Sequence, residues 1–402
     1  MPARFTEVRV VKPISKHPTN ISKEENMRKL FAVTGILIIA SIVLAACGGA
    51  APAPAPTGGG EPVTVVETVI VEVPGETVVT QPQGYGTILS RVKERGRLVC
   101  GGRTDLLGFG YLDDNGNNIG FDIDLCHAVA AAVLGDASAV EIVPLTAADR
   151  GPALQTGEVD LLARNVTWNT KRDAEWGNFT VVMFYDGQTF IVRNDSGIET
   201  LQDMNGATIC VTTGTTTENN LASAFSDAGL TFEAVTFEDT ASVYSAYDEG
   251  RCDAATSDAS QLAAIRVGLQ DPASHKLLDF TISKEYLTPA VPAGDDQWFD
   301  LVKTVMWSLI AAEEFGITSS NVEEMKASPN GDIRTLLGAE ADWGYVQLGV
   351  DASALANAIS AVGNYGEIYD RYFGANGIAF ELDRGRNNLG INGGWLVAPA
   401  IK

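Results

Sequence analysis

The chain has few of the side chains that metal sites and nucleophilic sites use most often. Its 402 residues include 3 histidines and 5 cysteines, and no two cysteines form a C-x-x-C motif. Structural zinc sites are built from cysteine and histidine ligands that cluster in the sequence. His17 lies near the amino terminus, and neither His127 nor His275 belongs to a motif that would place it beside a nucleophile in a cleft. We therefore expect no metal, no cofactor and no catalytic triad.

Basic side chains are also scarce. The sequence contains 28 lysine and arginine residues against 51 aspartate and glutamate residues, which gives a formal net charge of −23. A protein that binds nucleic acid neutralises phosphates with basic side chains, so we exclude nucleic acid as a partner. A strong negative charge is ordinary for an exported protein that stays off anionic lipid and cell wall.

Only one long apolar run occurs. Residues 30–46 contain no charged side chain, Arg28 and Lys29 precede them, and the run ends in Leu44-Ala45-Ala46-Cys47. A basic flank, a short apolar core and small residues at its end are typical of a secretory signal, and the last four residues have the form of a lipobox. We expect Cys47 to carry the lipid anchor, because two or more acyl chains hold a protein stably at a membrane. An uncleaved membrane anchor is the alternative, and both readings place the later residues outside the cytoplasm.

The first 26 residues suit neither part of such a signal, because they include Pro13, Glu24 and Glu25. Met27, by contrast, begins a compact signal of ordinary length. We therefore interpret residues 1–46 as the signal region, with the true translation start at Met27.

Residues 47–86 have the composition of a linker. Gly, Ala and Pro fill residues 48–62, which is typical of a flexible to semi-rigid spacer. Residues 63–80 are rich in Val and Thr and resemble strands, but Pro74 and Gly75 interrupt them. We expect a stalk that lifts the body off the membrane; an oligomerising or edge-pairing segment is the alternative.

Beyond the linker, apolar strand-like stretches alternate with helical patterns, and the alternation restarts near residue 188. Strands that alternate with helices predict mainly parallel sheets flanked by helices. We therefore predict a two-lobed α/β fold with a two-segment hinge. The first lobe would comprise residues 87–187, the second 188–283, and the return to the first lobe 284–402, with helical stretches at 297–314, 320–326 and 353–373.

Four cysteines follow Cys47, an even number that permits two disulfides outside the cytoplasm. Three pairings are possible. We favour Cys100–Cys126 and Cys210–Cys252, because each pair then stays within one half of the chain.

Three polar segments follow predicted strands, at the sheet edge where open α/β folds bind ligands. The first, residues 164–172, offers backbone groups, the Thr167 hydroxyl and the Arg172 guanidinium. An arginine binds a carboxylate bidentately in a planar geometry. The alternative is that Arg172 is a surface ion-pair partner of Asp173 or Glu175.

The other two segments complement the first. Residues 213–218 begin a helix, where free N–H groups favour an anion, although no G-K-[ST] follows and the pattern also fits an ordinary capping box. Residues 256–260 contain Asp258, which could pair with a ligand ammonium or merely cap the next helix. Two anion receptors and one carboxylate together predict a site for a zwitterion.

These segments resemble the extracytoplasmic amino-acid-binding proteins of ABC importers, which have the type II periplasmic-binding fold. The resemblance covers residues 95–402 almost continuously and is nearest to the general L-amino-acid and glutamate–glutamine branch. It is carried by stretches such as GFDIDLCHAVAAAVLGD, GEVDLLARNVTW, ICVTTGTTTENNL, GRCDAATSDASQLAA and VGNYGEIYDRYFG.

The resemblance implies a role for each member of the site. Arg172 would grip the α-carboxylate of an L-amino acid, and Asp258 would take its α-ammonium. Further contacts would come from Thr167, the backbone at Asn165, the helix start at Gly214, Thr215 and Thr216, and a pocket wall at Leu106 and Phe109.

Two positions depart from the pattern of commoner relatives. Arg103 stands where an acidic or polar residue is frequent, and Gly151, after Arg150, stands where an aromatic often begins a helix. We expect both positions at the side-chain end of the pocket. Positive charge there, from Arg103 and Arg164, would favour Glu, Gln, Asp or Asn and repel Lys and Arg. If Arg103 pointed to solvent, a broad specificity would follow.

The implied function is not catalytic. We expect the solute-binding component of an ABC importer, a monomer that delivers an L-α-amino acid to the membrane permease. A dehydratase-like enzyme of the same fold and the sensor domain of a receptor are the alternatives. The first needs an acid or base that no cleft histidine supplies, and the second would continue past Lys402 into membrane-spanning and signalling segments.

Overall fold

The computed structural model describes residues 72–73, 76–77 and 86–402. The expected signal region, the start at Met27, the lipidation site Cys47 and most of the linker lie outside these residues. None of the helices in the described part of the chain has the length and hydropathy needed to cross a bilayer.

The chain divides into two compact units, residues 1–77 and 78–402. In the first unit, β1 (Glu72–Val73) and β2 (Glu76–Thr77) pair antiparallel within the Val/Thr-rich segment. The second unit contains the lobes and the site.

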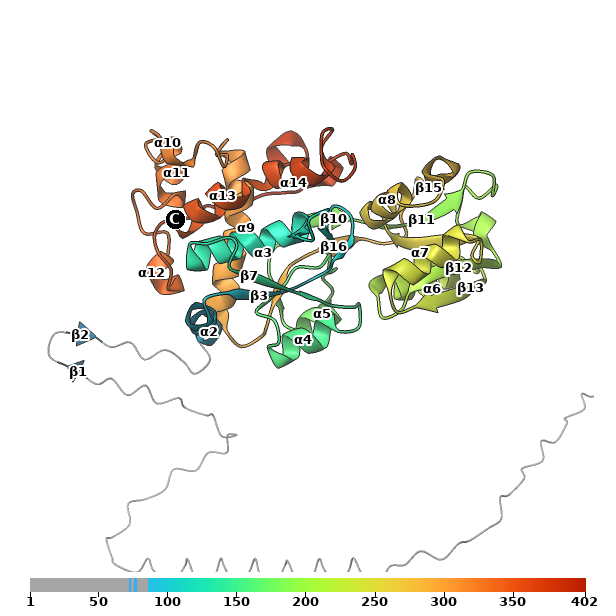
Figure 1. Ribbon diagram of the computed structural model, residues 1–402, viewed down its shortest axis with the longest axis horizontal. Coiled ribbons are helices and arrows are strands. Elements are labelled where there is room, and N and C mark those ends of the chain that lie inside the picture. The colour runs from blue at the N-terminus through green and yellow to red at the C-terminus, as the bar shows by residue number, and fades with distance from the viewer. Residues whose placement is uncertain (1–71, 74–75, 78–85) are drawn as a thin grey trace, which may run out of the picture. The chain divides into compact units, whose positions relative to one another are not determined.

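Two five-stranded sheets in the second unit are built on the same plan (Figure 1). From edge to edge, the first sheet runs through β7 (Val140–Pro144), β3 (Leu98–Gly102), β8 (Leu161–Leu162), β17 (Ala290–Val291) and β9 (Asn178–Phe179). The second runs through β13 (Phe232–Phe237), β12 (Ala207–Thr212), β14 (Ala254–Asp258), β11 (Gln188–Arg193) and β15 (His275–Leu277).

Both sheets are mainly parallel, as the alternating pattern predicts. In each sheet four strands point the same way and one is reversed, β17 in the first and β11 in the second. The parallel pairs need crossover connections, and helices supply them. Each reversed strand lies next to the place where the chain passes between the lobes.

The two lobes are joined by a pair of antiparallel strands, β10 (Phe184–Asp186) and β16 (Glu285–Leu287). The chain leaves the first lobe along β10 and returns along β16, which is the predicted two-segment hinge. The register places Asp186 directly opposite Glu285.

The second lobe has an apolar cluster on each face of its sheet. One gathers around Phe190 and Phe225, and the other around Tyr244, Tyr247 and Leu262. The helices that contribute to these clusters are α6 (Thr216–Asp227), α7 (Thr240–Asp248) and α8 (Ala259–Val267).

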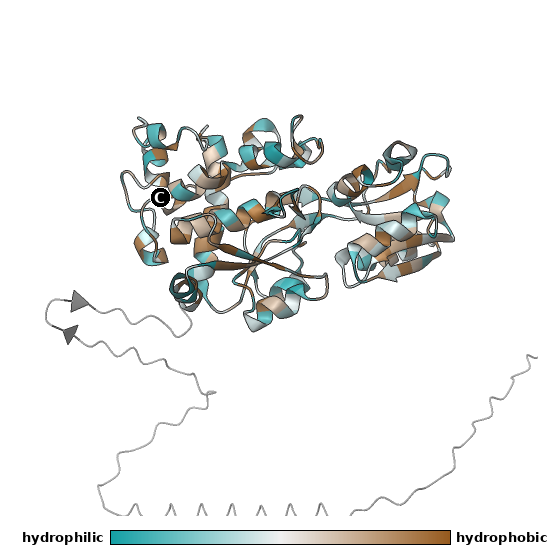
Figure 2. Cartoon of the chain, in the orientation of Figure 1, coloured by the Kyte–Doolittle hydropathy of each residue, from teal (hydrophilic) through white to brown (hydrophobic). Residues whose placement is uncertain are grey.

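The first lobe carries most of the helices and the largest core. Its centre is an aromatic group in which Phe121, Phe184 and Phe373 contact one another. Apolar residues run through β3 and β7 and along α3, whereas the outer loops are mainly hydrophilic (Figure 2).

The longer helices are α2 (Thr87–Arg95), α3 (Phe121–Leu134), α4 (Arg150–Thr156), α9 (Asp296–Glu314), α13 (Ala354–Val362) and α14 (Tyr365–Phe373). The short elements are α5 (Thr170–Glu175), α10 (Val322–Met325), α11 (Gly331–Leu336), α12 (Tyr345–Leu348) and the strands β4 (Asp105–Leu106), β5 (Gly110–Leu112) and β6 (Asn118–Ile119).

The single helix expected over 353–373 is wrong, because the chain breaks it in two. Gly363 has φ +90°, a conformation that helices do not contain. Asn364 then starts α14, accepting a hydrogen bond from the Glu367 backbone while the Glu367 side chain accepts one from the Asn364 backbone. This capping box is a strong helix start, and the apolar periodicity on both sides of it hid the break.

Both predicted disulfides are present. Cys100–Cys126 ties β3 to α3 in the first lobe, and Cys210–Cys252 ties β12 to the segment before β14 in the second. Neither crosses from one lobe to the other, so the hinge stays unconstrained.

Candidate ligand-binding site

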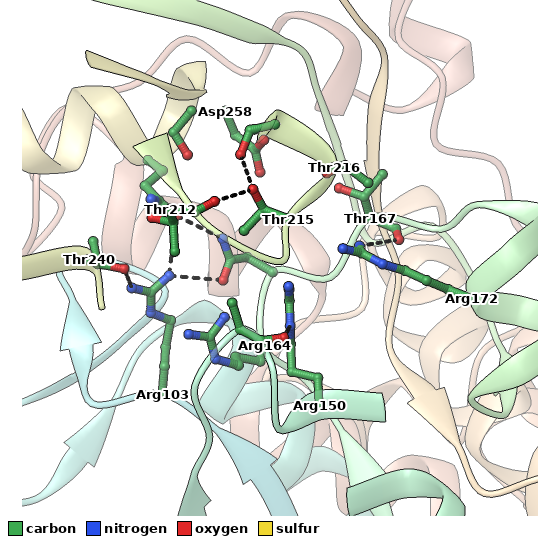
Figure 3. Close-up of a pocket in the computed structure, with 15 residues that line it drawn as sticks. Arg103, Arg150, Arg164, Thr167, Arg172, Thr212, Thr215, Thr216, Thr240 and Asp258 are labelled. Atoms are coloured by element: carbon green, nitrogen blue, oxygen red, sulfur yellow. Dashed lines mark hydrogen bonds between the residues drawn. The ribbon is translucent and has the colours of Figure 1, made fainter. Parts of the chain in front are cut away.

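A cavity of about 40 Å³ lies between the two lobes, beside the hinge. Figure 3 shows Arg172 and Thr167 at one end, Arg103 and Thr240 at the other, and Arg150 and Arg164 between them. The first lobe contributes Arg103, Ala147, Arg150, Arg164, Asn165, Thr167 and Arg172, and the second contributes Thr212, Thr215, Thr216, Thr217, Thr240, Ser257, Asp258 and Gln261.

Arg172 is held in one orientation by its own short helix. The Asn169 side chain caps α5 by accepting a hydrogen bond from the Arg172 backbone at 2.9 Å. The guanidinium carbon lies 4.7 Å from the ring centroid of Trp176, and Nη1 donates to the Thr167 carbonyl at 3.0 Å. Arg172 is buried against these partners rather than paired with Asp173 at the surface. A fixed guanidinium plane at the cavity wall suits bidentate binding of a carboxylate.

The start of α6 faces Arg172 from the other lobe. Thr215 caps this helix, its Oγ1 accepting from the Glu218 backbone at 3.1 Å, while the Glu218 carboxylate accepts from Gly214 N at 2.9 Å. Thr215 therefore caps the helix, but the reciprocal bond of a capping box is not formed, because Glu218 accepts from Gly214 N rather than from Thr215 N. Thr215 and Thr216 also line the cavity. The first N–H groups of a helix carry partial positive charge, so an anion is favoured here.

Asp258 ends β14 and is buried in the cavity wall. Its side chain makes no capping hydrogen bond to α8, so the alternative role as a helix cap is wrong. Burial raises the pKa of Asp258, and the carboxylates of Asp186 and Glu285 raise it further. A ligand ammonium beside Asp258 would oppose this effect and stabilise the ionised form.

Arg103 bridges the two lobes. Its Nε donates to Asp105 at 2.7 Å and its Nη1 to Asn165 at 3.1 Å, both within the first lobe. Nη1 also donates to Gln261 Oε1 at 3.2 Å and Nη2 to Thr240 Oγ1 at 3.1 Å, across the cleft. Arg103 is only 2% exposed, so it does not point to solvent. It closes one end of the cavity with donors that protein acceptors already occupy.

Arg150 and Arg164 bring further positive charge into the cavity. Arg150 donates from Nε to the Ala147 carbonyl at 3.0 Å, but its Nη2 is buried without a hydrogen-bond partner among the described residues. Burial and the neighbouring arginines lower the pKa of Arg150 well below its ordinary value. Burial and Arg103 lower the pKa of Arg164 to about 9. A second anionic group in the cavity would raise the pKa values of both arginines toward their ordinary value.

Two carboxylates of the hinge lie behind the cavity. Glu285 is buried and accepts hydrogen bonds from Thr167 in the first lobe, and from Thr216 (3.0 Å) and Asn220 (2.7 Å) in the second. Opposite it, Asp186 accepts from Gly187 N at 2.8 Å. Glu285 therefore holds the two lobes together through hydroxyls that also line the cavity.

Four residues expected at the site lie elsewhere. Leu106 and Phe109 are buried in the first-lobe core, where Phe109 packs on Phe121 at a centroid distance of 6.3 Å, and neither lines the cavity. Gly214 is exposed, and its N–H is bonded to Glu218 rather than directed at the cavity. Gly151 also lies outside: a Cβ added there would come within 2.7 Å of Trp176, so glycine makes room for the ring that supports Arg172.

Several lining residues were missed by the sequence analysis, although a signal existed for most. Arg150 and Thr240 each begin a helix that follows a strand in the sequence, a placement similar to the one that singled out Thr215. Gln261 lies three residues after Asp258, which is one helical turn. Among the described residues no cluster of His, Cys, Asp and Glu side chains could hold a metal ion.

The sequence matches known proteins over most of the second unit. Residues 98–321 match the family of bacterial extracellular solute-binding proteins, family 3. The chain is 48% identical over 318 residues to the general L-amino acid-binding periplasmic protein AapJ of Rhizobium johnstonii, covering 79% of this chain and 93% of that protein. It is 45% identical to the glutamate/glutamine/aspartate/asparagine-binding protein BztA of Rhodobacter capsulatus, covering 78% of this chain and 93% of that protein.

A solved structure has the same fold. The ABC transporter periplasmic binding protein of Brucella ovis, with glutathione bound, superposes with a TM-score of 0.75 at 44% identity, covering 78% of this chain and 99% of that one. The type II periplasmic-binding fold predicted from the sequence motifs is therefore confirmed. The chain belongs to family 3 of the bacterial extracellular solute-binding proteins.

Proposed function

We propose that this chain is the amino-acid-binding component of an ABC importer, and that it acts by binding rather than by catalysis. The observation that carries the proposal is the interlobe cavity, in which Arg172 and Asp258 line the wall from opposite lobes. The names of the Rhizobium and Rhodobacter relatives support amino acids as ligands. A permease in the membrane would receive the amino acid.

The α-groups of the ligand would close the lobes. Its α-carboxylate would bind Arg172 from the first lobe and the start of α6, at Thr215 and Thr216, from the second. Its α-ammonium would pair with Asp258. Because the ligand contacts both lobes, its binding energy favours the closed arrangement.

The side chain of the ligand would extend toward Arg150 and Arg164. An acidic or amide side chain can accept hydrogen bonds from Nη2 of Arg150, which has no partner in the part of the chain that the structure describes. A lysine or arginine side chain would bring a further cation into a cavity that already holds several. We therefore propose Glu, Gln, Asp or Asn as ligands, with the acidic members bound more tightly.

Calorimetry and thermal unfolding of the purified chain test this choice of ligands. At about one hundred times its dissociation constant, a true ligand stabilises the folded state by about 2.7 kcal/mol. We expect this stabilisation with L-glutamate or L-aspartate, a smaller one at equal concentration with the amides, and none with D-glutamate. A large effect of L-lysine or L-arginine, with none from L-glutamate, would refute the ligand class.

We also propose that Cys47 anchors the chain by lipid at the outer face of the cytoplasmic membrane or in the periplasm. The lipobox form of residues 44–47 supports this. Metabolic labelling with a radioactive fatty acid should label the wild-type chain and leave Cys47→Ala unlabelled. Equal labelling of the two proteins would contradict the lipid anchor. If translation starts at Met27, deleting residues 1–26 should leave the labelling intact.

A further inference from the structure

The segment after α14 lies against the hinge. We call residues 384–398 the tail segment. Leu389 and Leu396 within it are buried in the core of the first lobe. At its start, Arg384 donates from Nη1 and Nη2 to the two carboxylate oxygens of Glu313 on α9, at 2.6 and 3.0 Å. The tail segment is therefore fixed to the first lobe.

Asn387 joins the tail segment to the first hinge strand. Its Oδ1 accepts from the Tyr185 N–H at 2.7 Å, and its Nδ2 donates to the Tyr185 carbonyl at 3.1 Å. Tyr185 is the middle residue of β10. The buried Asn387 side chain thus bonds to both backbone groups of one residue, as a residue of a neighbouring antiparallel strand does. Nη2 of Arg384 donates to the Asn387 carbonyl at 2.9 Å, which connects this contact to the ion pair with α9.

Trp395 contacts both hinge strands. Its ring centroid lies 5.4 Å from that of Tyr185 on β10 and 6.3 Å from that of Tyr286 on β16, with interplanar angles of 82° and 89°. The two tyrosines lie opposite each other in the strand pair, and their ring centroids are 5.2 Å apart. Aromatic rings in this edge-to-face arrangement attract one another. The three rings therefore form one cluster across the two segments that join the lobes.

This aromatic cluster is formed while the lobes are in contact. In the same structure Arg103 and Glu285 make hydrogen bonds to residues of both lobes. Opening the cleft requires changes in the backbone dihedrals of β10 and β16, because hinge motions are absorbed by the few residues that connect the moving parts. Such changes shift the rings on these strands relative to Trp395, which stays with the first lobe. The contacts of the tail segment therefore favour the closed arrangement.

We propose that Trp395 and Asn387 are positioning residues for ligand binding. By holding the hinge strands, they set how readily the lobes separate and how long a bound amino acid is retained. Neither residue lines the ligand cavity, so their effect passes through Tyr185 and Tyr286. The inference rests on the proposed function, because it concerns the release of the same amino acid. It also gives a role in binding to a segment that follows residues 98–321, the part that matches the family.

Substitution of Trp395 tests this role with L-glutamate as the probe. Trp395→Ala removes both ring contacts, and we expect the affinity for L-glutamate in calorimetry to fall about three- to tenfold. The dissociation rate should rise by a similar factor. By small-angle scattering, ligand-free Trp395→Ala should have a larger radius of gyration than the wild type, and saturating L-glutamate should restore the compact value. Trp395→Phe keeps an aromatic ring and should lie between the two.

A second substitution and a control separate this role from a structural one. Asn387→Asp replaces the donor to the Tyr185 carbonyl by an acceptor, so it should change affinity and radius in the same direction as Trp395→Ala. The control, Ile391→Ala, lies on the same tail segment at a side chain that is 74% exposed, and it should match the wild type.

The outcomes distinguish this inference from the proposed function. If Trp395→Ala lowers only the free energy of unfolding, with wild-type affinity and radius, the tail segment is merely structural and the inference is wrong, while the proposed function stands. If the wild type binds neither L-glutamate nor any other L-amino acid, the proposed function itself fails. Equal radii of ligand-free wild type and Trp395→Ala would overturn the inference in that case too.

Discussion

Arg172 shows how a single side chain is prepared for its ligand. The stacking on Trp176 and the hydrogen bond to the Thr167 carbonyl fix its guanidinium before any ligand arrives. Arg172→Ala removes the charge partner of a desolvated carboxylate, a loss of roughly 3–5 kcal/mol. We expect amino-acid affinity to fall at least about a hundredfold by calorimetry.

The neighbouring Lys171 provides the control for this substitution. It lies on the same short helix but is exposed to solvent and lines no part of the ligand cavity. Lys171→Ala should bind with wild-type affinity. A normal affinity of Arg172→Ala would show that the carboxylate binds elsewhere.

The sequence predicted the polar half of the site better than its apolar wall. Arg172, Thr167 and Asp258 could be located because strand ends and helix starts in an α/β fold meet at one edge. Leu106 and Phe109 could not be placed, because an apolar residue in a loop fits a pocket wall and a core equally well. That Nη2 of Arg150 finds no partner among residues 86–402 is a property of three-dimensional packing, and the sequence pattern does not indicate it.

Among the structural elements, the hinge strands combine a mechanical and a chemical role. Glu285 on β16 accepts hydrogen bonds from Thr167 of one lobe and from Thr216 and Asn220 of the other. Glu285→Gln replaces one carboxylate oxygen by an amide NH₂ group, which would face the donors that the oxygen accepted from. A buried donor without a hydrogen-bond partner costs about 1–3 kcal/mol. We expect the closed arrangement to lose population and ligand affinity to fall by about 5- to 150-fold.

Small-angle scattering tests whether Glu285→Gln weakens ligand binding by opening the lobes. Ligand-free Glu285→Gln should have a larger radius of gyration than the wild type, and saturating ligand should restore the compact value. Lys284→Gln, an exposed neighbour in the sequence, should match the wild type in both states. Weaker binding without any change in radius would mean that Glu285 acts on the ligand alone.

The disulfides brace one element against another inside each lobe. Cys100–Cys126 closes a separation of 26 residues and Cys210–Cys252 one of 42. Loop-closure entropy predicts a stabilisation of about 3–4 kcal/mol for each. We expect Cys210→Ala with Cys252→Ala to lower the denaturant midpoint of the second lobe while calorimetry still detects ligand binding. An unchanged midpoint would contradict the prediction.

Element boundaries followed from the sequence where one signal dominated. The helix expected over 297–314 is α9 (Asp296–Glu314), because a long amphipathic pattern dominates there. The α13–α14 break was missed because the sequence reads as apolar helix on both sides of Gly363. The short helix α5, which begins within the polar segment 164–172, was not predicted, since six residues give too little periodicity to detect.

At the scale of the whole molecule, buried carboxylates make stability depend on pH. Burial raises the pKa of Asp122 to about 7 and that of Asp186 to about 6, both above the ordinary value of 3.8. The folded state therefore holds more protons than the unfolded chain above about pH 4. Its stability falls as pH rises through these values, by up to about 1.4 kcal/mol per pH unit for each group.

Asp122→Asn tests the larger of these contributions. The amide oxygen can still accept the hydrogen bond from Asn165 N, which Asp122 accepts at 2.6 Å, but it does not titrate. Urea unfolding at pH 5 to 8 should give a shallower decline of unfolding free energy for Asp122→Asn than for the wild type. Parallel declines in the two proteins would show that Asp122 does not titrate in this range.

The position of β17 has a consequence for how the chain is made. This strand pairs with both β8 and β9, placing Ala290 beside Leu162 and Phe179, yet it is synthesised only after the whole second lobe. The second lobe is one uninterrupted segment, so it can fold before β17 is available. The first lobe must wait with an open sheet edge, and long-range pairings of this kind form slowly. A chaperone that shields β8 and β9 during synthesis or export would therefore act on the first lobe, although its residues emerge first.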